Sequence, residues 1–502
     1  MKIAPTKITH LLATNVAESL ASDWIKSTTY VSGQKAYVLY SDFPELINYG
    51  SCIFETFTEG VGWTYDGTNS AYASDGSQAG DSLLTQTTSS LEVGAKYLSV
   101  FEVQAFTAGN ITTYAGGGEG TDRAAIGWYA EVITAGATDS KIGLIADLDF
   151  VGRVSNISFK QVTDYVARNI YESQAGANTN QYPPDDDGTY WVKISASNRW
   201  KMFDDKMSSK TEILDKLSVK VKANKTDTLA FFLLEATGVE YIMSDDSFYE
   251  TSTTSMTPAL GSISFVMSTN NTIWAIGSEV EVYRTADQRA FMIGIITAWD
   301  SGTGDITITV DAFDDPAGSA PYTDWTIAIV YNHETADLVT KNATSWKQFY
   351  FGDFVYSSSK TYTFSLGFDT SLRVIFTNAA DTMVRCGHMV VARGNYLGKT
   401  EWGVRSGFTS LSTKEVDAFG HYSPVKRANF QEQRYTIRME LGSVDINRQL
   451  LASLDTIPCV FEGNNDDKVF DMLTVFAFIQ DYEINLNTYN DYELDIELQE
   501  LA

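Results

Sequence analysis

Six aromatic and basic side chains in the first third of the chain have the chemistry of a sugar-binding site. Sugar rings stack their apolar C–H faces on Trp and Tyr rings, while hydroxyls at the ring edge take directional hydrogen bonds. Tyr114 is the strongest surface candidate, because the glycine-rich run Gly116–Gly120 beside it permits close approach of a ligand. Burial in a core is the competing interpretation for the tryptophans, since large aromatic side chains are highly buried on average. The candidates are Trp63, Tyr65, Tyr114, Arg123, Trp128 and Tyr129.

Other reactive residue types do not converge on a catalytic pattern. The chain has no nucleophile elbow, no phosphate-binding loop and no dinucleotide fingerprint. Its four histidines lack the spacing of a metal site, and they are His10, His333, His388 and His421. We therefore predict no catalytic residues, no metal and no cofactor. Carboxylate pairs for glycoside hydrolysis stay open as an alternative, because 64 acidic residues offer many pairs whose separation depends on the fold.

Two acidic runs are candidates for calcium binding, Asp185-Asp186-Asp187 and Asp314-Asp315. Calcium loops space their oxygen ligands and add a distant bidentate carboxylate. Neither run shows that spacing, so solvated turns are the favoured interpretation.

Composition and charge narrow the classes of partner. The 502 residues include 44% hydrophobic and 13% aromatic residues, enough to fill several separate cores. A formal net charge of −28 repels phosphate backbones and anionic membrane surfaces, so neither nucleic acid nor membrane insertion is expected. Cys52, Cys386 and Cys459 are too widely spaced to indicate a disulfide framework or a thiolate metal cluster. The N-terminal residues lack the apolar run of a signal peptide, which favours folding in a cytoplasm.

Alternation of apolar and polar residues with period two predicts β-strands along almost the whole chain. Lys141–Ala146, Asp305–Val310 and Thr361–Leu366 each place one face of a strand in a core. Clusters of Gly, Asn, Asp and Ser between the strands supply tight turns. Three stretches have helical character, and they are Thr14–Ser22, Ser209–Lys216 and Asp445–Leu454.

The order of strand and turn patterns along the chain indicates that two compact modules are inserted into larger β domains. Long insertions at exposed loop tips are tolerated, because closing a longer loop costs little and leaves the host core intact. We predict an all-β fold of β-sandwich, jelly-roll and small β-barrel modules. The first expected domain consists of residues 1–57 and 161–207 and carries residues 58–160 as an insert. The second consists of residues 208–260 and 331–400 and carries residues 261–330 as an insert. Residues 401–502 form the expected C-terminal domain.

The segments that flank the first insert share a recognisable pattern. Trp24, Tyr30 and Gly33 precede the insert, while Tyr171-Glu172-Ser173 and Tyr190-Trp191 follow it. Together they resemble the two halves of a small chitin-binding-like module, with an alanine, at position 36, where that module's first element closes on valine.

The first insert is similar to a carbohydrate-binding jelly roll of the kind that recurs in phage tail proteins. The similarity rests on Gly62–Gly67, on Tyr97–Val103 and on a closing strand at Ser155–Phe159. The resemblance implies binding of a host-surface glycan by this module.

The second insert resembles a small β module of phage tail fibres. That module follows the order G-x-x-V-x-V, G-x-V-T-x-Y, G-x-L-T-V-x-V and D-W-x-I, and four segments match it in order: Gly277–Val282, Gly294–Trp299, Gly304–Val310 and Asp324–Ile327. Ser195–Asp205 and Leu450–Gly463 are similar to virion proteins whose genes lie among those of the tail tip.

These resemblances imply a structural protein of a tailed bacteriophage, in the tail tip, baseplate or tail fibre. Its expected partners are other phage tail proteins and further copies of itself, as a trimer or hexamer, with the protein made in the host cytoplasm and located in the virion. The regular terminal strand at Asp491–Leu498 is expected either to pair with a neighbouring subunit or to lie at the edge of a sheet. The competing functions are a free carbohydrate-binding protein, a polysaccharide-degrading enzyme with binding modules, and a tail component whose inserts only fill gaps.

Overall fold

The computed structural model divides the chain into two units, Glu18–Ser197 and Met1–Ala17 with Asn198–Ala502. It is 60% strand and 4% helix, with antiparallel sheets throughout, which confirms the all-β prediction. The residues that the structure describes are 1–6, 11–18, 24, 28–41, 45–48, 50–52, 55–88, 91–137, 139–162, 167–179, 181–185, 188–204, 206, 209–269, 274–315, 318, 321–340, 355–356, 359–367, 369–410, 412–416, 422–425, 429–463, 473–488 and 491–500.

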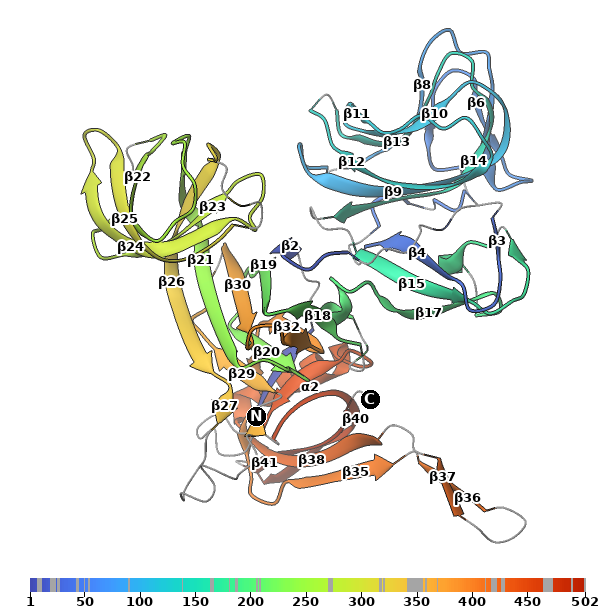
Figure 1. Cartoon of the computed structure of the whole chain (residues 1–502). Helices are drawn as coiled ribbons and strands as arrows, with labels where there is room; N and C mark the ends of the chain where they lie inside the picture. Colours follow the sequence, from blue (N-terminus) through green and yellow to red (C-terminus); the bar gives the residue numbers. More distant parts are fainter. Residues whose placement is uncertain are drawn as a thin grey trace. The chain divides into compact units, whose positions relative to one another are not determined.

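A two-sheet sandwich fills most of the unit Glu18–Ser197 (Figure 1). Its inner faces enclose a core that includes Tyr72, Phe101 and Phe159. One sheet contains, in order, β11 (Gly118–Glu119), β10 (Ile111–Ala115), β13 (Lys141–Ala146), β8 (Ser82–Thr87) and β5 (Thr58–Glu59). The other sheet contains, in order, β12 (Gly127–Thr134), β9 (Lys96–Ala108), β14 (Val151–Val162), β7 (Ala71–Asp75) and β6 (Trp63–Asp66).

Segments from both sides of this sandwich pair with each other in a small module. β4 (Lys35–Tyr40), β15 (Ala167–Ser173) and β17 (Trp191–Ala196) form a three-stranded sheet, and β3 (Thr29–Tyr30) pairs with β16 (Asn178–Thr179). Motif residues make its core, since Tyr30 and Trp191 meet edge to face with centroids 4.9 Å apart over the buried Ala36. A 3-10 turn, η1, spans Pro183–Asp185.

A nine-stranded sheet forms the spine of the larger unit. Its long strands β21 (Gly238–Ser252) and β26 (Trp325–Asp337) pair along nearly their full length, so the module between them grows out of the sheet as a continuous extension. The order is β2-β19-β30-β21-β26-β23-β24-β25-β22. The other strands are β2 (Leu11–Thr14), β19 (Lys216–Lys222), β30 (Thr370–Thr377), β23 (Glu279–Arg284), β24 (Phe291–Asp300), β25 (Asp305–Asp314) and β22 (Gly261–Val266).

The end of this sheet closes into a small barrel, because Met267, directly after β22, bridges back to Ser252 at the end of β21. Figure 1 shows β22 to β25 grouped at one end of β21 and β26. Alternation explains the barrel interior: Ile306, Ile308 and Val310 of β25 are buried, whereas the threonines between them are half-buried. The core also holds Trp325, which is fully buried and donates its indole N–H to the carbonyl of Thr254 over 3.1 Å.

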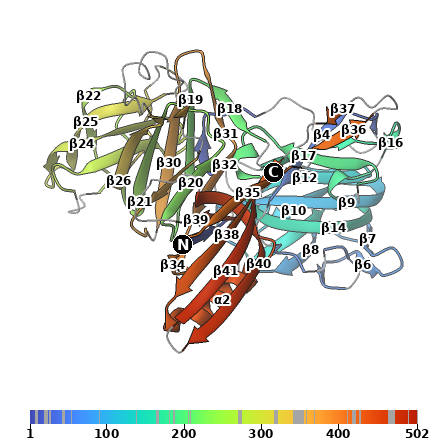
Figure 2. The same cartoon turned by 90° about the horizontal axis from the view of Figure 1, so that it is seen from below.

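A second closed sheet contains the C-terminal strands of the larger unit (Figure 2). Residues 395–400 join its two edges, because β33 (Asn395–Tyr396) pairs with β1 (Lys2–Pro5) while β34 (Lys399–Thr400) pairs with β38 (Asn429–Met439). The helix α2 (Val444–Ser453) packs Leu451 into the core of this sheet. The other strands are β39 (Cys459–Glu462), β40 (Thr474–Thr488), β41 (Asp491–Glu500) and β35 (Arg405–Ser410).

Short elements complete the unit. They are β20 (Thr228–Phe232) with β29 (Lys360–Thr363) and β32 (His388–Ala392), β18 (Thr211–Leu214) with β31 (Met383–Cys386), β27 (Val339–Thr340) with β28 (Val355–Tyr356), β36 (Thr413–Val416) with β37 (Tyr422–Val425), and the turns η2 (Lys201–Phe203) and η3 (Leu441–Ser443).

The structure corrects several sequence-based expectations. The helix expected at Asp445–Leu454 is present as α2, but Ser209–Lys216 contains strand β18 because pairing with β31 overrides local propensity. In Thr14–Ser22, Thr14 ends β2 and residues 15–18 are not helical, while 19–22 lie outside the described residues. The terminal strand β41 is neither an edge nor free to pair elsewhere, because β38 and β40 flank it.

The division of the chain also differs from the predicted domains at two places. Met1–Ala17 and residues 198–207 group with the larger unit and not with the small module expected at 1–57 and 161–207. The expected C-terminal domain 401–502 shares its sheet with β1 and with residues 395–400. Strand pairing across long sequence separations decides both outcomes, and such pairing leaves no local signal.

Candidate functional site

Three of the six candidate sugar-binding residues line one cavity in the unit Glu18–Ser197. These are Arg123, Trp128 and Tyr129, and the cavity volume is about 390 Å³. This volume lies in the range of about 300–1,000 Å³ that is common for small-molecule sites. The remaining lining residues are Trp24, Tyr37, Val38, Leu39, Ile126, Gly127, Ala130 and Tyr182. We call this site the aromatic cavity.

Strand β12 places two candidate rings on opposite faces of its sheet, because successive side chains of a strand alternate. Tyr129 packs toward the sandwich core, with its ring centroid 5.4 Å from that of Phe101 and its hydroxyl donating to the carbonyl of Ala125 over 2.7 Å. Trp128 points the other way and stacks on Tyr182, with centroids 4.5 Å apart and planes 8° apart. One strand therefore supplies both an anchored and a half-exposed aromatic ring.

Trp24 and Tyr182 come from the small module and complete the aromatic wall. Their rings meet edge to face, with centroids 5.3 Å apart. The backbone N–H of Trp24 donates to the carbonyl of Tyr37 over 2.9 Å, which holds the Trp24 backbone beside β4. Trp24 belongs to the chitin-binding-like pattern, so the sequence held a signal for it. Tyr182 follows Gln181 in a loop and no motif singled it out.

Strand β4 borders the aromatic cavity through Tyr37, Val38 and Leu39. Backbone groups of an antiparallel strand alternate in direction, and the Tyr37 carbonyl faces Trp24, away from β15. Leu39 lies two residues further along β4, so its N–H and C=O also face away from β15. Leu39 is one of the residues that line the cavity. The Leu39 N–H and C=O therefore face the same side of β4 as the Trp24 backbone.

Arg123 is the only formally charged residue among the described residues of the cavity wall. Its Nη2 donates to Glu131 over 3.1 Å, and its guanidinium lies 5.0 Å from the centroid of the Tyr129 ring. Glu131 also accepts hydrogen bonds from the Thr113 hydroxyl at 2.7 Å and from the Thr121 N–H at 3.0 Å. Burial raises the pKa of Tyr129 against the opposing influence of Arg123, so this phenol stays neutral at physiological pH.

The other three candidates lie away from the cavity. Trp63 is 5% exposed and donates its indole N–H to the carbonyl of Ser82, as the core interpretation predicted. Tyr65 is half-buried against Tyr72. The expected exposure of Tyr114 is wrong, since this side chain is 7% exposed and donates to Asp139 over 3.0 Å.

The glycine-rich loop beside Tyr114 has a structural explanation. Gly116 and Gly117 adopt φ of +56° and +92° in the turn that joins β10 to β11. Residues with a side chain rarely adopt this conformation, so the turn itself requires glycine. The glycines are therefore explained by the turn between β10 and β11, and they give no evidence that a ligand approaches there.

The acidic runs do not form a metal site in the part of the chain that the structure describes. There, no group of three or more His, Cys, Asp or Glu side chains has metal-binding geometry. Asp314 pairs with Lys216 at 2.9 Å, and Asp315 accepts a hydrogen bond from Tyr322 at 2.8 Å. Asp185 lies in η1, whereas positions 186 and 187 lie outside the described residues.

A buried ionic cluster in the larger unit went unnoticed in the sequence. Glu281 of β23 accepts from Lys220 at 3.0 Å and from Arg373 at 2.7 Å, and all three side chains are at most 1% exposed. Burial lowers the pKa of Lys220 to about 8. Burial opposes ionisation of Glu281, but Lys220 and Arg373 outweigh it and lower its pKa. The cluster joins β19, β23 and β30, where the barrel leaves the central sheet.

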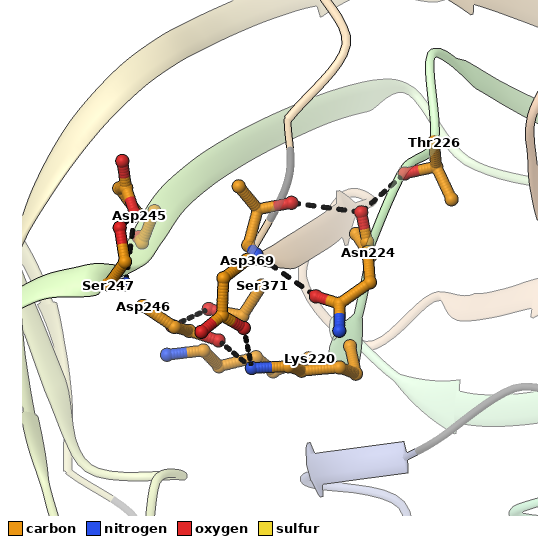
Figure 3. A network of polar contacts seen from close by, with 12 residues as sticks. Lys220, Asn224, Thr226, Asp245, Asp246, Ser247, Asp369 and Ser371 are labelled. Atoms are coloured by element: carbon orange, nitrogen blue, oxygen red, sulfur yellow. Dashed lines mark hydrogen bonds and ion pairs between the residues drawn. The ribbon is translucent and has the colours of Figure 1, made fainter.

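A half-exposed extension of this network lies on the neighbouring strands. Lys222 binds Asp246 at 2.8 Å and Asp369 at 2.7 Å, and Asp246 accepts from the Ser371 hydroxyl at 2.9 Å. Figure 3 shows Asp246, Asp369 and Ser371 of this extension converging. Each carboxylate has a basic or hydroxyl partner, so the extension is a structural contact and not an open ligand site.

Comparison with known proteins returned no family model and no curated protein that matches this chain. No helix within the described residues is both long and apolar enough to cross a membrane. The case for function therefore rests on the aromatic cavity and on the architecture that positions it.

Proposed function

We propose that this chain is a structural protein of a tailed-phage tail, in the tail-tip or baseplate region, which assembles as a symmetric oligomer and binds carbohydrate on the host surface. The observation that carries the binding proposal is the aromatic cavity, which Arg123, Trp128, Trp24 and Tyr182 all line. Flat apolar rings beside a few directional polar groups suit a sugar ring. No carboxylate is among the described residues of the cavity wall, which favours binding over hydrolysis.

The insertion architecture supports a display role for the two modules. Strands β4 and β15 pair with each other although the whole sandwich lies between them in the chain. The barrel likewise leaves along β21 and returns along β26, and these two strands remain paired in the central sheet. Each module can thus be carried without disturbing the core of its host.

An oligomer would make weak sugar binding effective, because linked sites raise avidity without any new contact. The edge strand β35 supports such assembly. It pairs with β38 alone among the described strands, and Phe408 on it is 70% exposed. Nearby, Trp402 is 96% exposed, and an exposed edge with large apolar side chains is typical of an association surface.

Substitution of one cavity tryptophan tests the binding proposal. Trp128→Ala removes a ring that faces the cavity, and Tyr249→Ala is the control because it removes an aromatic ring that is 53% exposed and lies outside the cavity. Both variants and the unmodified protein are titrated against immobilised host-surface glycans. We expect Trp128→Ala to weaken binding by about 1–3 kcal/mol, the scale of one lost aromatic contact, with no change in Tyr249→Ala.

Two results would count against the proposal. If the unmodified protein binds no glycan from a susceptible host, the binding function fails. If particles that carry a deletion of residues 58–160 adsorb to host cells as well as the parent particles, the first module has no role in adhesion.

A further inference from the structure

The aromatic cavity has the charge balance of a site for uncharged sugars. We propose that it selects neutral pyranosides over uronates and sugar phosphates, and this inference rests on the proposed carbohydrate-binding function. The selecting pair is Arg123 and Glu131, which lie on the chain segment before β12 and on β12 itself.

Glu131 neutralises Arg123, the only cation among the described residues of the cavity wall. The Arg123 Nη2 and a Glu131 carboxylate oxygen are 3.1 Å apart, and the two side chains are 25% and 11% exposed. Hydrogen bonds from Thr113 and Thr121 hold the same carboxylate in place. The guanidinium therefore offers N–H donors to a ligand while contributing little net charge.

An anionic sugar would lose hydration in this cavity without gaining a counter-charge. Desolvating an ionised group is unfavourable unless it is paired with an opposite charge and hydrogen-bonded. Lys and His are absent from the described cavity lining, and the rest of the wall is aromatic or aliphatic. The formal charge of −28 adds a repulsive field for anions at long range.

A neutral pyranose meets complementary groups in the same space. Its apolar C–H face can lie on the indole of Trp128, whose opposite face already rests on Tyr182. Its hydroxyls can accept hydrogen bonds from the Arg123 guanidinium where this residue lines the cavity. Every one of these contacts is available without an ionised ligand.

Matched ligands and one isosteric variant test the inference. The ligands are methyl pyranosides and their uronates, which differ only in a hydroxymethyl group or a carboxylate, titrated by calorimetry at low and at physiological salt. Glu131→Gln keeps the shape and an acceptor oxygen but leaves Arg123 uncompensated. Asp75→Asn is the charge-matched control, because Asp75 is an exposed carboxylate on β7 of the same sandwich and outside the cavity.

We expect the unmodified protein to bind the neutral ligand about tenfold more tightly than the uronate, which equals about 1.4 kcal/mol. Glu131→Gln should tighten uronate binding by a similar factor at low salt, and Asp75→Asn should leave the preference unchanged. Equal or tighter binding of the uronate by the unmodified protein would overturn the inference but leave carbohydrate binding intact. Failure to bind either class at any salt concentration would overturn the proposed function itself.

Discussion

Trp128 of the sandwich stacks face to face on Tyr182 of the small module, with ring centroids 4.5 Å apart and planes 8° apart. In the sequence, Trp128 precedes β14, the last strand of the insert, whereas Tyr182 follows β15, where the host module resumes. Their contact therefore forms only when the insert folds onto its host. The stack therefore both builds the cavity wall and ties the insert to the module that carries it.

A double-mutant cycle should measure this stack directly. We predict a coupling of about 0.5–1.5 kcal/mol between Trp128→Ala and Tyr182→Ala in thermal unfolding, the scale of one aromatic pair. Tyr182→Phe should keep the ring contact and most of the coupling. Strictly additive effects of the two alanine substitutions would show that the rings do not stabilise each other.

The stability contributed by His333 should depend on pH in a defined window. Its ring nitrogens contact Glu240 at 3.0 Å and Glu279 at 2.6 Å, and these hydrogen bonds raise the pKa of His333 from 6.5 to about 10. A raised folded-state pKa stabilises the fold fully below pH 6.5, and this contribution disappears as the pH rises toward about 10.

The variant His333→Gln tests that window. The melting-temperature difference from the unmodified protein should be largest near pH 6 and should shrink steadily toward pH 10. We expect about 1–2 kcal/mol at the lower pH, because the side chain is 25% exposed and solvent screens part of the interaction. A difference that is constant across this range would contradict the charged state of His333.

Removing the shared carboxylate of the buried ionic cluster should destabilise the larger unit strongly. Glu281→Gln leaves Lys220 and Arg373 buried without their counter-charge, and such a loss costs about 3–5 kcal/mol. Urea unfolding followed by tryptophan fluorescence should detect the loss. The triple replacement Lys220→Met, Glu281→Leu and Arg373→Met should recover most of it, because no unpaired charge then remains. Failure of the triple variant to recover would indicate that the cluster's hydrogen bonds, and not its charge balance, matter most.

The β35 edge should govern self-association. Phe408→Lys places a charge on an exposed edge strand, which disfavours pairing with another chain. Leu260→Lys is the control, since this side chain is 63% exposed on the barrel module. Light scattering should show a lower mass for Phe408→Lys alone, while circular dichroism should show the same strand content for both variants and the unmodified protein. An oligomer that survives Phe408→Lys would place the association surface elsewhere.

Local patterns account for much of the fold. Alternation along β13 and β25 predicted strands, and a single amphipathic stretch predicted α2. The strands of the sandwich run from Thr58 to Val162, and its core also includes Ile47, Cys52 and Phe57 from before the expected insert at 58–160. These features depend on neighbouring residues, so they are readable without knowledge of tertiary contacts.

Burial of individual rings was less predictable. Tyr114 has a glycine-rich loop beside it, yet β13 and β11 flank its strand and its side chain is buried. Ser209–Lys216 has a helical composition, but four residues of it pair with β31. In both cases a partner distant in sequence decides the outcome, and local propensity does not report on distant partners.

By itself, the sequence determined the all-β class, the types of residue suited to stacking on sugars, and an acidic charge that disfavours nucleic acid. Only the tertiary structure decided that Trp128 joins Trp24 and Tyr182 while Trp63 enters the core. It also decided that Glu131 neutralises Arg123. The physical reason is that strand alternation fixes which side chains share a face, whereas the packing of one module on another fixes which faces meet.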